Sequence, residues 1–159
     1  MRAAMLPHLK AGIAALVLGV GLVACATGHS QSTTRFEVHA ASLTESPDWQ
    51  KANLRDDPGT TVYIAPEVLL DNADVALADA KKDLGGQVLI VIQTTPAGTA
   101  RMGLASRVLL RQRMAVMIDG EVLTAPVVSA PLSGNRFAIT GFTSFEEAQE
   151  IARGIVSKK

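Results

Sequence analysis

The chain opens with an apolar run and then alternates between strand-like and helix-like patterns of hydrophobic and polar residues. Residues 11–24 carry no charge and consist of Ala, Gly, Ile, Leu and Val. Residues 26–34 (ATGHSQSTT) are small and mostly polar, without hydrophobic periodicity, which is typical of a flexible tether. Periodic patterns begin at residue 35. The pattern predicts a leader at 1–24, a tether at 25–34 and one folded domain at 35–159.

In the first half of the domain, short apolar segments alternate with turn-rich ones. The periodicity at Ala73, Leu77 and Ala80, followed by Gly85-Gly86, predicts a helix. The run VLIVI is continuously apolar and predicts a central strand covered on both faces. The expected elements are a strand at 35–40, a long loop at 41–60, a strand at 61–65, a helix at 71–84 and a strand at 88–92.

The second half carries the clearest local signals. Asp119-Gly120 between two apolar runs predicts a hairpin, because a two-residue type I′ turn needs two residues that tolerate positive φ. A buried stripe at Ala148, Ile151 and Ile155 predicts a final helix. The expected elements are a helix at 97–112, strands at 114–118, 121–124 and 136–140, and a helix from residue 143 or 144 to 155. Together they predict an α+β fold, a single domain with a mostly antiparallel sheet and helices packed on one face.

Composition and charge exclude several classes of function. The 159 residues include 15 Lys plus Arg, 15 Asp plus Glu and one Cys. A net charge of zero argues against a nucleic-acid binder that neutralises phosphates. A single cysteine cannot form an internal disulfide, so the core must hold the fold. The leader contains Arg2 and Lys10 and no acidic residue, so the remaining chain has a net charge of about −2.

The leader has the pattern of a secretory signal peptide. Its basic start and apolar run fit such a signal, and the run is shorter than the roughly 20 residues that a membrane-spanning helix needs. The segment Leu22-Val23-Ala24-Cys25 resembles the lipobox of bacterial lipoproteins. This resemblance implies cleavage before Cys25, lipidation of Cys25 with chains such as palmitate, and anchoring in a membrane through that lipid. Ala26, where lipoproteins kept at the inner membrane commonly carry Asp, favours the outer membrane. The alternative for Cys25 is a small buried hydrophobe.

The segment from residue 114 to 155, "MAVMIDGEVLTAPVVSAPLSGNRFAITGFTSFEEAQEIARGI", resembles the periplasmic head domain of SecD, a subunit of the bacterial preprotein translocase. Upstream, "VYIAPEVLLDNADVALADA" is similar to the family's strand and helix before its central strand. The resemblance covers most of residues 36–156. Its structural motif positions in this chain are Asp119, Gly120, Ala125, Pro126, Gly134 and Gly141.

The resemblance implies a SecD-head-like fold and a surface that contacts polypeptide on the outer side of the membrane. SecD itself has several transmembrane helices and works with SecF as a proton-driven machine, whereas no spanning segment is expected here after residue 24. The region after Pro96 also departs from the family, since it keeps only the Gly and Leu of the usual pattern. We therefore expect this chain to share the fold of the SecD head but not the proton-driven motor function of SecD.

Several candidate positions have both a structural and a functional interpretation. Asp119-Gly120 is explained by its turn, and Ala125-Pro126 by the end of an edge strand, where a missing N–H is harmless. Four arginines at and after the second helix form either a solvated surface or contacts to lipid headgroups or peptidoglycan; they are Arg101, Arg107, Arg111 and Arg113. A short edge strand could also accept an extended peptide by β-augmentation.

The sequence offers no catalytic residue, cofactor site or metal site. Beyond the leader it contains only His29 and His39, and no metalloprotease, nucleophile-elbow or P-loop motif is present. We therefore expect a non-enzymatic lipoprotein of the cell envelope that faces the periplasm, acts as an accessory to protein export and binds unfolded polypeptide or an envelope protein. The alternatives are an architectural lipoprotein packed on another envelope component, and a hydrolase with an unrecognised site.

Overall fold

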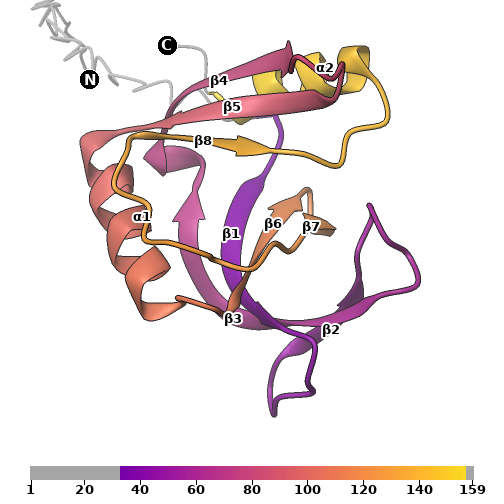
Figure 1. Cartoon of the computed structure of the whole chain (residues 1–159), viewed down its shortest axis with the longest axis vertical. Coiled ribbons are helices and arrows are strands. Elements are labelled where there is room, and N and C mark those ends of the chain that lie inside the picture. Colours follow the sequence, from indigo (N-terminus) through magenta and orange to yellow (C-terminus); the bar gives the residue numbers. More distant parts are fainter. Residues whose placement is uncertain (1–32, 157–159) are drawn as a thin grey trace, which may run out of the picture.

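A computed structural model describes residues 33–156, which contain eight strands, two α-helices and one 3-10 turn (Figure 1). The elements are β1 (Phe36–Ser42), β2 (Gln50–Asn53), β3 (Thr61–Asp71), η1 (Asn72–Asp74), β4 (Val75–Lys82), β5 (Val88–Thr94), α1 (Pro96–Val108), β6 (Arg113–Ile118), β7 (Glu121–Thr124), β8 (Arg136–Ile139) and α2 (Phe145–Ile155). The predicted α+β class with antiparallel strands is confirmed, but the strands form two sheets instead of one. The leader, Cys25 and most of the predicted tether lie outside the described residues.

The lower layer is a five-stranded sheet, in the order β2-β3-β1-β6-β7, that curls into a small barrel. After β2, the backbone N–H groups of Arg55 and Asp56 donate to the carbonyl oxygens of Val122 and Leu123 on β7, at 2.9 and 3.3 Å. These bonds join the two ends of the sheet. The barrel encloses its own apolar cluster, which consists of Ala41, Leu54, Val62, Ile64, Ala115, Met117, Val122 and Ala125.

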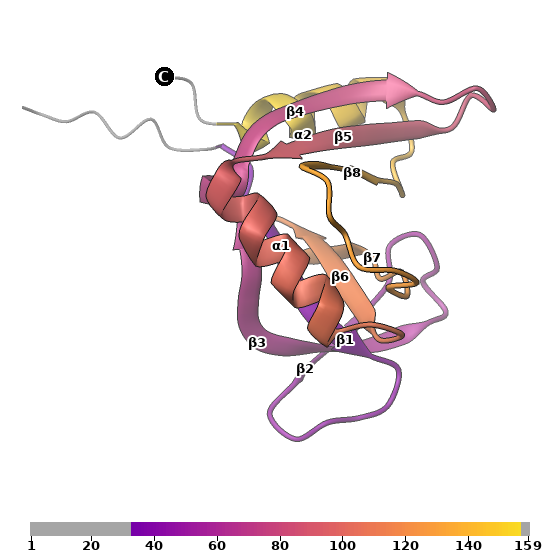
Figure 2. The same cartoon turned by 60° about the vertical axis from the view of Figure 1, so that its left-hand side comes forward.

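The upper layer is a three-stranded sheet in the order β4-β5-β8 (Figures 1 and 2). Its inner face and α2 close the main core over the barrel, where Ile90 and Ile92 of β5 meet Ile155 of α2 and Phe36 of β1. The predicted strand at 88–92 is therefore central in its sheet. The predicted cover on both faces is wrong, because Leu89 and Val91 on the outer face stay partly exposed. The strand covered on both faces is β6, whose alternate residues enter the two cores.

The predicted helix at 71–84 is wrong. Asp71 does cap a helical turn, with its side chain accepting from the backbone N–H of Ala73 at 2.8 Å, but that turn is the single 3-10 turn η1. The chain then pairs with β5 as β4. Ala78 and Ala80 pack against the main core on the side of α2. The small alanine side chains allow α2 to pack closely on β4. Their spacing resembles that of a helical stripe, but here they belong to a strand. Leu84, the last residue of the predicted helix, is fully exposed in the connection between β4 and β5.

Three predicted boundaries also differ from the structure. The loop at 41–60 contains the short strand β2, whose mostly exposed residues QKAN give no apolar alternation. The strand expected at 61–65 continues to Asp71, because a bulge opposite Ala40 accommodates Pro66 within β3. Helix α1 ends at Val108, since Arg111 has a positive φ of 66° in the turn that follows. The domain therefore has two α-helices among the described residues, where three were predicted.

Candidate functional site

A cavity of about 470 Å³ opens between the two layers, beside β8. Its inner wall is formed by Val38 of β1, by Met114 and Val116 of β6 and by Met102 of α1. All four side chains are buried and apolar. Two methionines give the wall unbranched, polarisable side chains that adapt to differently shaped partners. The volume lies in the range of sites that hold small ligands or several side chains of a peptide.

The upper wall of the cavity is β8, and this strand has an unpaired edge. It ends the order β4-β5-β8, so no other strand of residues 33–156 lies on its second side. All four of its residues and Thr140 line the cavity. Figures 1 and 2 both show β8 as the strand of the upper sheet that lies nearest the barrel. An open strand edge and an apolar cavity therefore occupy the same place.

The register identifies which backbone groups of β8 face that edge. The N–H of Thr94 donates to the carbonyl oxygen of Asn135 at 2.9 Å, so these two residues form a hydrogen-bonded pair. Bonded and non-bonded pairs alternate along an antiparallel ladder. Ile92 and Phe137 are the next bonded pair in register. The N–H and C=O groups of Arg136 and Ala138 consequently point away from β5, toward the unpaired edge.

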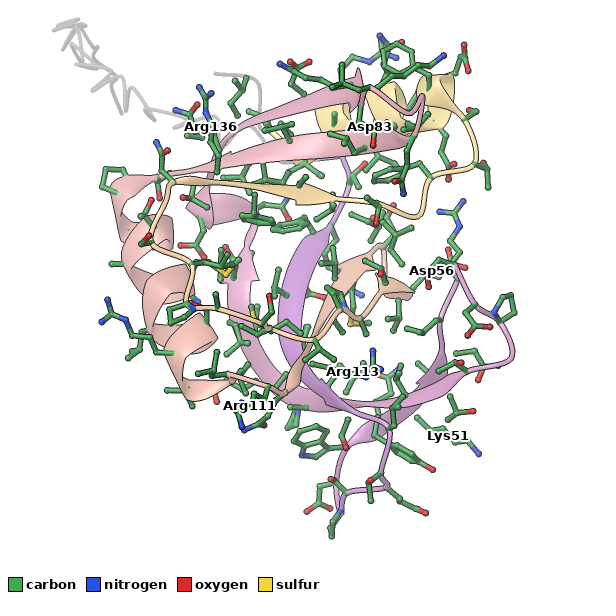
Figure 3. All side chains as sticks on the ribbon, in the orientation of Figure 1. Lys51, Asp56, Asp83, Arg111, Arg113 and Arg136 are labelled. Carbon is green, nitrogen blue, oxygen red and sulfur yellow. The ribbon has the colours of Figure 1, made fainter. Side chains whose placement is uncertain are left out.

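The loop between β7 and β8 forms the outer wall of the cavity. Residues 126–130 and Leu132 line it. The loop is held at its start by Met114, whose N–H donates to the Pro126 carbonyl at 3.0 Å, and near its centre by the hydroxyl of Ser106, which accepts from the N–H of Leu132 at 2.9 Å. Arg136 lies at the start of β8, where its guanidinium donates to Gln93 (Figure 3). The rim is thus polar at one end. The loop is also held by Val128, whose backbone carbonyl accepts from the N–H of Arg111 and whose N–H donates to the carbonyl oxygen of Gln112.

Of the six positions of the predicted structural motif, Pro126 alone lines this cavity, and the six do not form a cluster of reactive groups. Asp119 and Gly120 have φ values of 51° and 87° and make the two-residue turn of the β6–β7 hairpin. Ala125 is buried, and Pro126 follows the end of β7 and lines the cavity. The next two positions sit in the connections around β8. Gly134 precedes the strand, and Gly141 follows it with a φ of 100° against Leu123.

The histidine considered in the sequence, His39, serves the fold. It lies buried on β1 in the barrel, where its Nδ1–H donates to the carbonyl oxygen of Ala65 in the β3 bulge at 2.9 Å. Its Nε2 has no hydrogen-bond partner among the described residues and lies 3.9 Å from a carboxylate oxygen of Glu37. Within residues 33–156 there is no group of three or more His, Cys, Asp and Glu side chains arranged to hold a metal ion.

An ion-pair cluster fastens the upper layer to the barrel away from the cavity. The guanidinium of Arg55, just after β2, donates to Glu147 of α2 and lies 3.9 Å from Glu121 of β7. Burial raises the pKa of Glu147, but hydrogen bonds from the hydroxyl and the N–H of Thr143, together with Arg55, lower it overall to about 2. The Glu147 carboxylate is therefore charged at neutral pH.

The sequence indicated a strand near 136–140 and raised the possibility of β-augmentation, but it could not locate the open edge. Which edge of β8 is free depends on its pairing with β5, a contact between residues that lie more than 40 positions apart. The residues of the inner wall likewise come from β1, α1 and β6. Only the Ala125-Pro126 step, which follows β7 and leads into the outer wall, is a local signal in the sequence.

No helix in the described part of the chain is long and apolar enough to cross a membrane. The family model for the P1 head subdomain of SecDF matches residues 48–157. The protein translocase subunit SecDF of Thermus thermophilus is 34% identical over 120 residues, which are 76% of this chain and 16% of that protein. SecD of Acidaminococcus fermentans is 34% identical over 99 residues, which are 62% of this chain and 22% of that protein.

Solved structures agree with these relatives. A structure described as that of a membrane component SecDF that enhances protein export has a TM-score of 0.65 and 26% identity, and the match covers 82% of this chain and 64% of that one. SecDF in its super-membrane-facing form gives the same TM-score at 25% identity, covering 82% of this chain and 19% of that one. The chain spans less than a quarter of the curated relatives' length. The chain belongs to the SecDF P1 head family.

Proposed function

We propose that this protein is a non-enzymatic accessory of protein export and that its head domain binds an extended segment of polypeptide along β8. The observation that carries the proposal is the unpaired edge of β8 beside the apolar cavity. The solved relative with 26% identity belongs to a component that enhances protein export, which supports the same process for this chain.

The arrangement suits a polypeptide of varied sequence. Strand addition uses backbone hydrogen bonds, which every residue except proline can donate, so affinity does not depend on a particular side chain. The alternate side chains of an added strand would point into the cavity toward Met102, Met114 and Val116. These adaptable apolar side chains accept many aliphatic residues. Weak, sequence-tolerant binding is what an accessory needs if it holds different exported chains in turn.

We further propose that the domain is held at the cell envelope, facing the periplasm, through lipid on Cys25, and that the membrane is the outer one. The lipobox-like segment and Ala26 support this. The variant Cys25→Ser tests the anchor separately from the binding site. We expect this variant to remain an unprocessed precursor that incorporates no palmitate, and normal maturation would refute the anchor.

Site-specific photo-crosslinking tests the binding site. A photoreactive amino acid at Ala138 on β8 or at Val127 on the outer wall should give many heterogeneous adducts with a reduced, carboxymethylated and therefore unfolded test protein. The same amino acid at Glu150, an exposed position on α2, is the control and should give few. A single discrete adduct in envelope extracts would instead indicate an architectural protein with one fixed partner. Equal amounts of crosslinked adduct from Ala138 and from Glu150 would overturn the assignment of the binding site.

A further inference from the structure

Basic residues are concentrated in the middle of this chain without any acidic neighbours in sequence. No Asp or Glu occurs between Asp83 and Asp119, a stretch that contains four arginines. Helix α1 and the turn after it lie in this stretch. A nearly neutral protein therefore carries one strongly basic segment, and the fold leaves three of its four arginines exposed.

The outer side of α1 combines those arginines with exposed aliphatic side chains. We define the arginine face as Leu104, Arg107, Val108, Leu110 and Arg111. Leu104 and Val108 are 66% and 67% exposed, although they belong to a helix whose opposite side packs in the core. Leu110 is 40% exposed. Aliphatic side chains exposed side by side on one helix favour an interaction surface.

The charges of the arginine face are not neutralised by neighbouring acids. Arg101 is paired with the buried Asp74 at 2.7 Å and is left out of the face for that reason. Arg107 and Arg111, by contrast, have no carboxylate within ion-pair distance among residues 33–156. The turn that carries Arg111 is fixed, because the Arg111 N–H donates to the carbonyl oxygen of Val128 at 2.8 Å.

The surface continues past the end of α1 into a second hollow. This hollow has a volume of about 400 Å³ and is lined by Arg111, Arg113, Trp49 and Leu43, among others. Figure 3 places Arg111 near the lower end of α1 and Arg113 to its right, toward the barrel. Tryptophan and arginine are side chains favoured where an apolar layer meets charged headgroups.

The start of α1 lies close to the point where the described chain begins. The side-chain amide of Asn72 donates to the Thr34 carbonyl at 2.9 Å, and two residues later the Asp74 carbonyl accepts from Thr95, the N-cap of α1, at 2.8 Å. The apolar run at 11–24 therefore leads, through the residues before Thr33, to the end of the domain where α1 starts. A lipid anchor on Cys25, which directly follows this run, would hold the end of the domain where α1 starts near the bilayer.

We propose that the arginine face docks on an anionic membrane surface. Leu104, Val108 and Leu110 would enter the headgroup region, and Arg107 and Arg111 would bind lipid phosphates, to which the planar guanidinium is well matched. Each basic residue near an anionic bilayer contributes a roughly constant attraction. Met102, which lines the polypeptide cavity, is buried on the opposite side of α1 from the aliphatic side chains that would enter the bilayer. The proposal does not depend on polypeptide binding.

The experiment uses the full chain in a Cys25→Ser background, where Leu104→Cys supplies the sole cysteine for a polarity-sensitive dye. The protein is reconstituted into vesicles of phosphatidylcholine, with or without an equal share of phosphatidylglycerol. Because the apolar run is present in both samples, pure phosphatidylcholine controls for mere proximity. We expect a blue shift of dye emission only with phosphatidylglycerol, and we expect salt to reverse it.

The double variant Arg107→Gln/Arg111→Gln should shift the docked-to-free ratio by about 30-fold, from two charges at the surface. The matched variant Lys51→Gln/Arg153→Gln removes two charges from other elements and should leave the shift intact. A blue shift of equal size on both kinds of vesicle, or no shift, would overturn the proposal. A blue shift of the dye produced by unfolded polypeptide without vesicles would indicate that the arginine face binds protein. That result would also overturn the proposal.

Discussion

The ion pair between Arg55 and Glu147 makes a quantitative prediction, because it links α2 to the barrel. The free carboxyl has an ordinary pKa of 4.5, and in the folded protein the pKa is about 2. The folded protein therefore stabilises the charged form of Glu147 relative to its protonated form. The difference corresponds to about 3 kcal/mol of folding free energy, an upper value since the side chain is 22% exposed to screening water.

The sign follows from linkage. A carboxyl whose pKa is lower in the folded state stabilises the fold above its unfolded pKa, and this contribution is lost as pH falls. The free energy of unfolding contributed by Glu147 should therefore be complete above about pH 5 and should disappear between pH 4.5 and 2. Arg55 stays protonated throughout this range.

Urea denaturation followed by circular dichroism at pH 7, 4.5 and about 2 measures the effect. Glu147→Gln should lower the free energy of unfolding by about 1–3 kcal/mol at pH 7, and its difference from the wild type should vanish near pH 2. Glu146→Gln removes the same charge from the same helical turn, at an exposed residue, and should change it by less than about 0.5 kcal/mol. A difference between wild type and Glu147→Gln that is equal at pH 7 and pH 2 would refute the reasoning.

Two further predictions concern how the layers are joined. In Gly98→Ala the added Cβ would lie 2.5 Å from the Asp74 carbonyl oxygen, so we expect a loss of about 2 kcal/mol or more in thermal or urea unfolding. Gly103→Ala on the same helix has 3.4 Å of room and should be neutral or slightly stabilising; equal losses would contradict the contact. Asn72→Ala removes side-chain hydrogen bonds to three backbone groups and should lower the free energy of unfolding by about 2 kcal/mol. The control Asn53→Ala, at an exposed residue, should lower it by less than about 0.5 kcal/mol. Similar values for the two asparagines would show that Asn72 does not clamp the chain.

The elements that the sequence predicted well are those whose signals are local. Asp119-Gly120 requires only its own two φ values, and the stripe of α2 at Ala148 and Ile155 needs only a nearby apolar surface. Thus the hairpin and the last helix are present, and the resemblance after residue 114 agrees with the family match.

The failures occur where tertiary contacts override local preference. Residues 71–84 carry a capping residue and alanines, yet pairing with β5 and packing under α2 make them a strand. The barrel could not be foreseen, because its closure depends on Arg55 reaching β7 across 67 residues of sequence. The cavity could not be predicted either, because tertiary contacts bring its walls together from β1, α1, β6 and β8.

The claim that polypeptide adds to β8 is tested most directly by amide hydrogen exchange at Arg136 and Ala138, whose N–H groups face the open edge. Adding the unfolded test protein should slow exchange at these two amides and leave Phe137 and Ile139, already bonded to β5, unchanged. Ala138→Pro removes the edge donor without breaking the β4-β5-β8 ladder and should weaken binding, whereas Ala138→Ser should not. Exchange at Arg136 and Ala138 that is unaffected by saturating polypeptide would contradict strand addition.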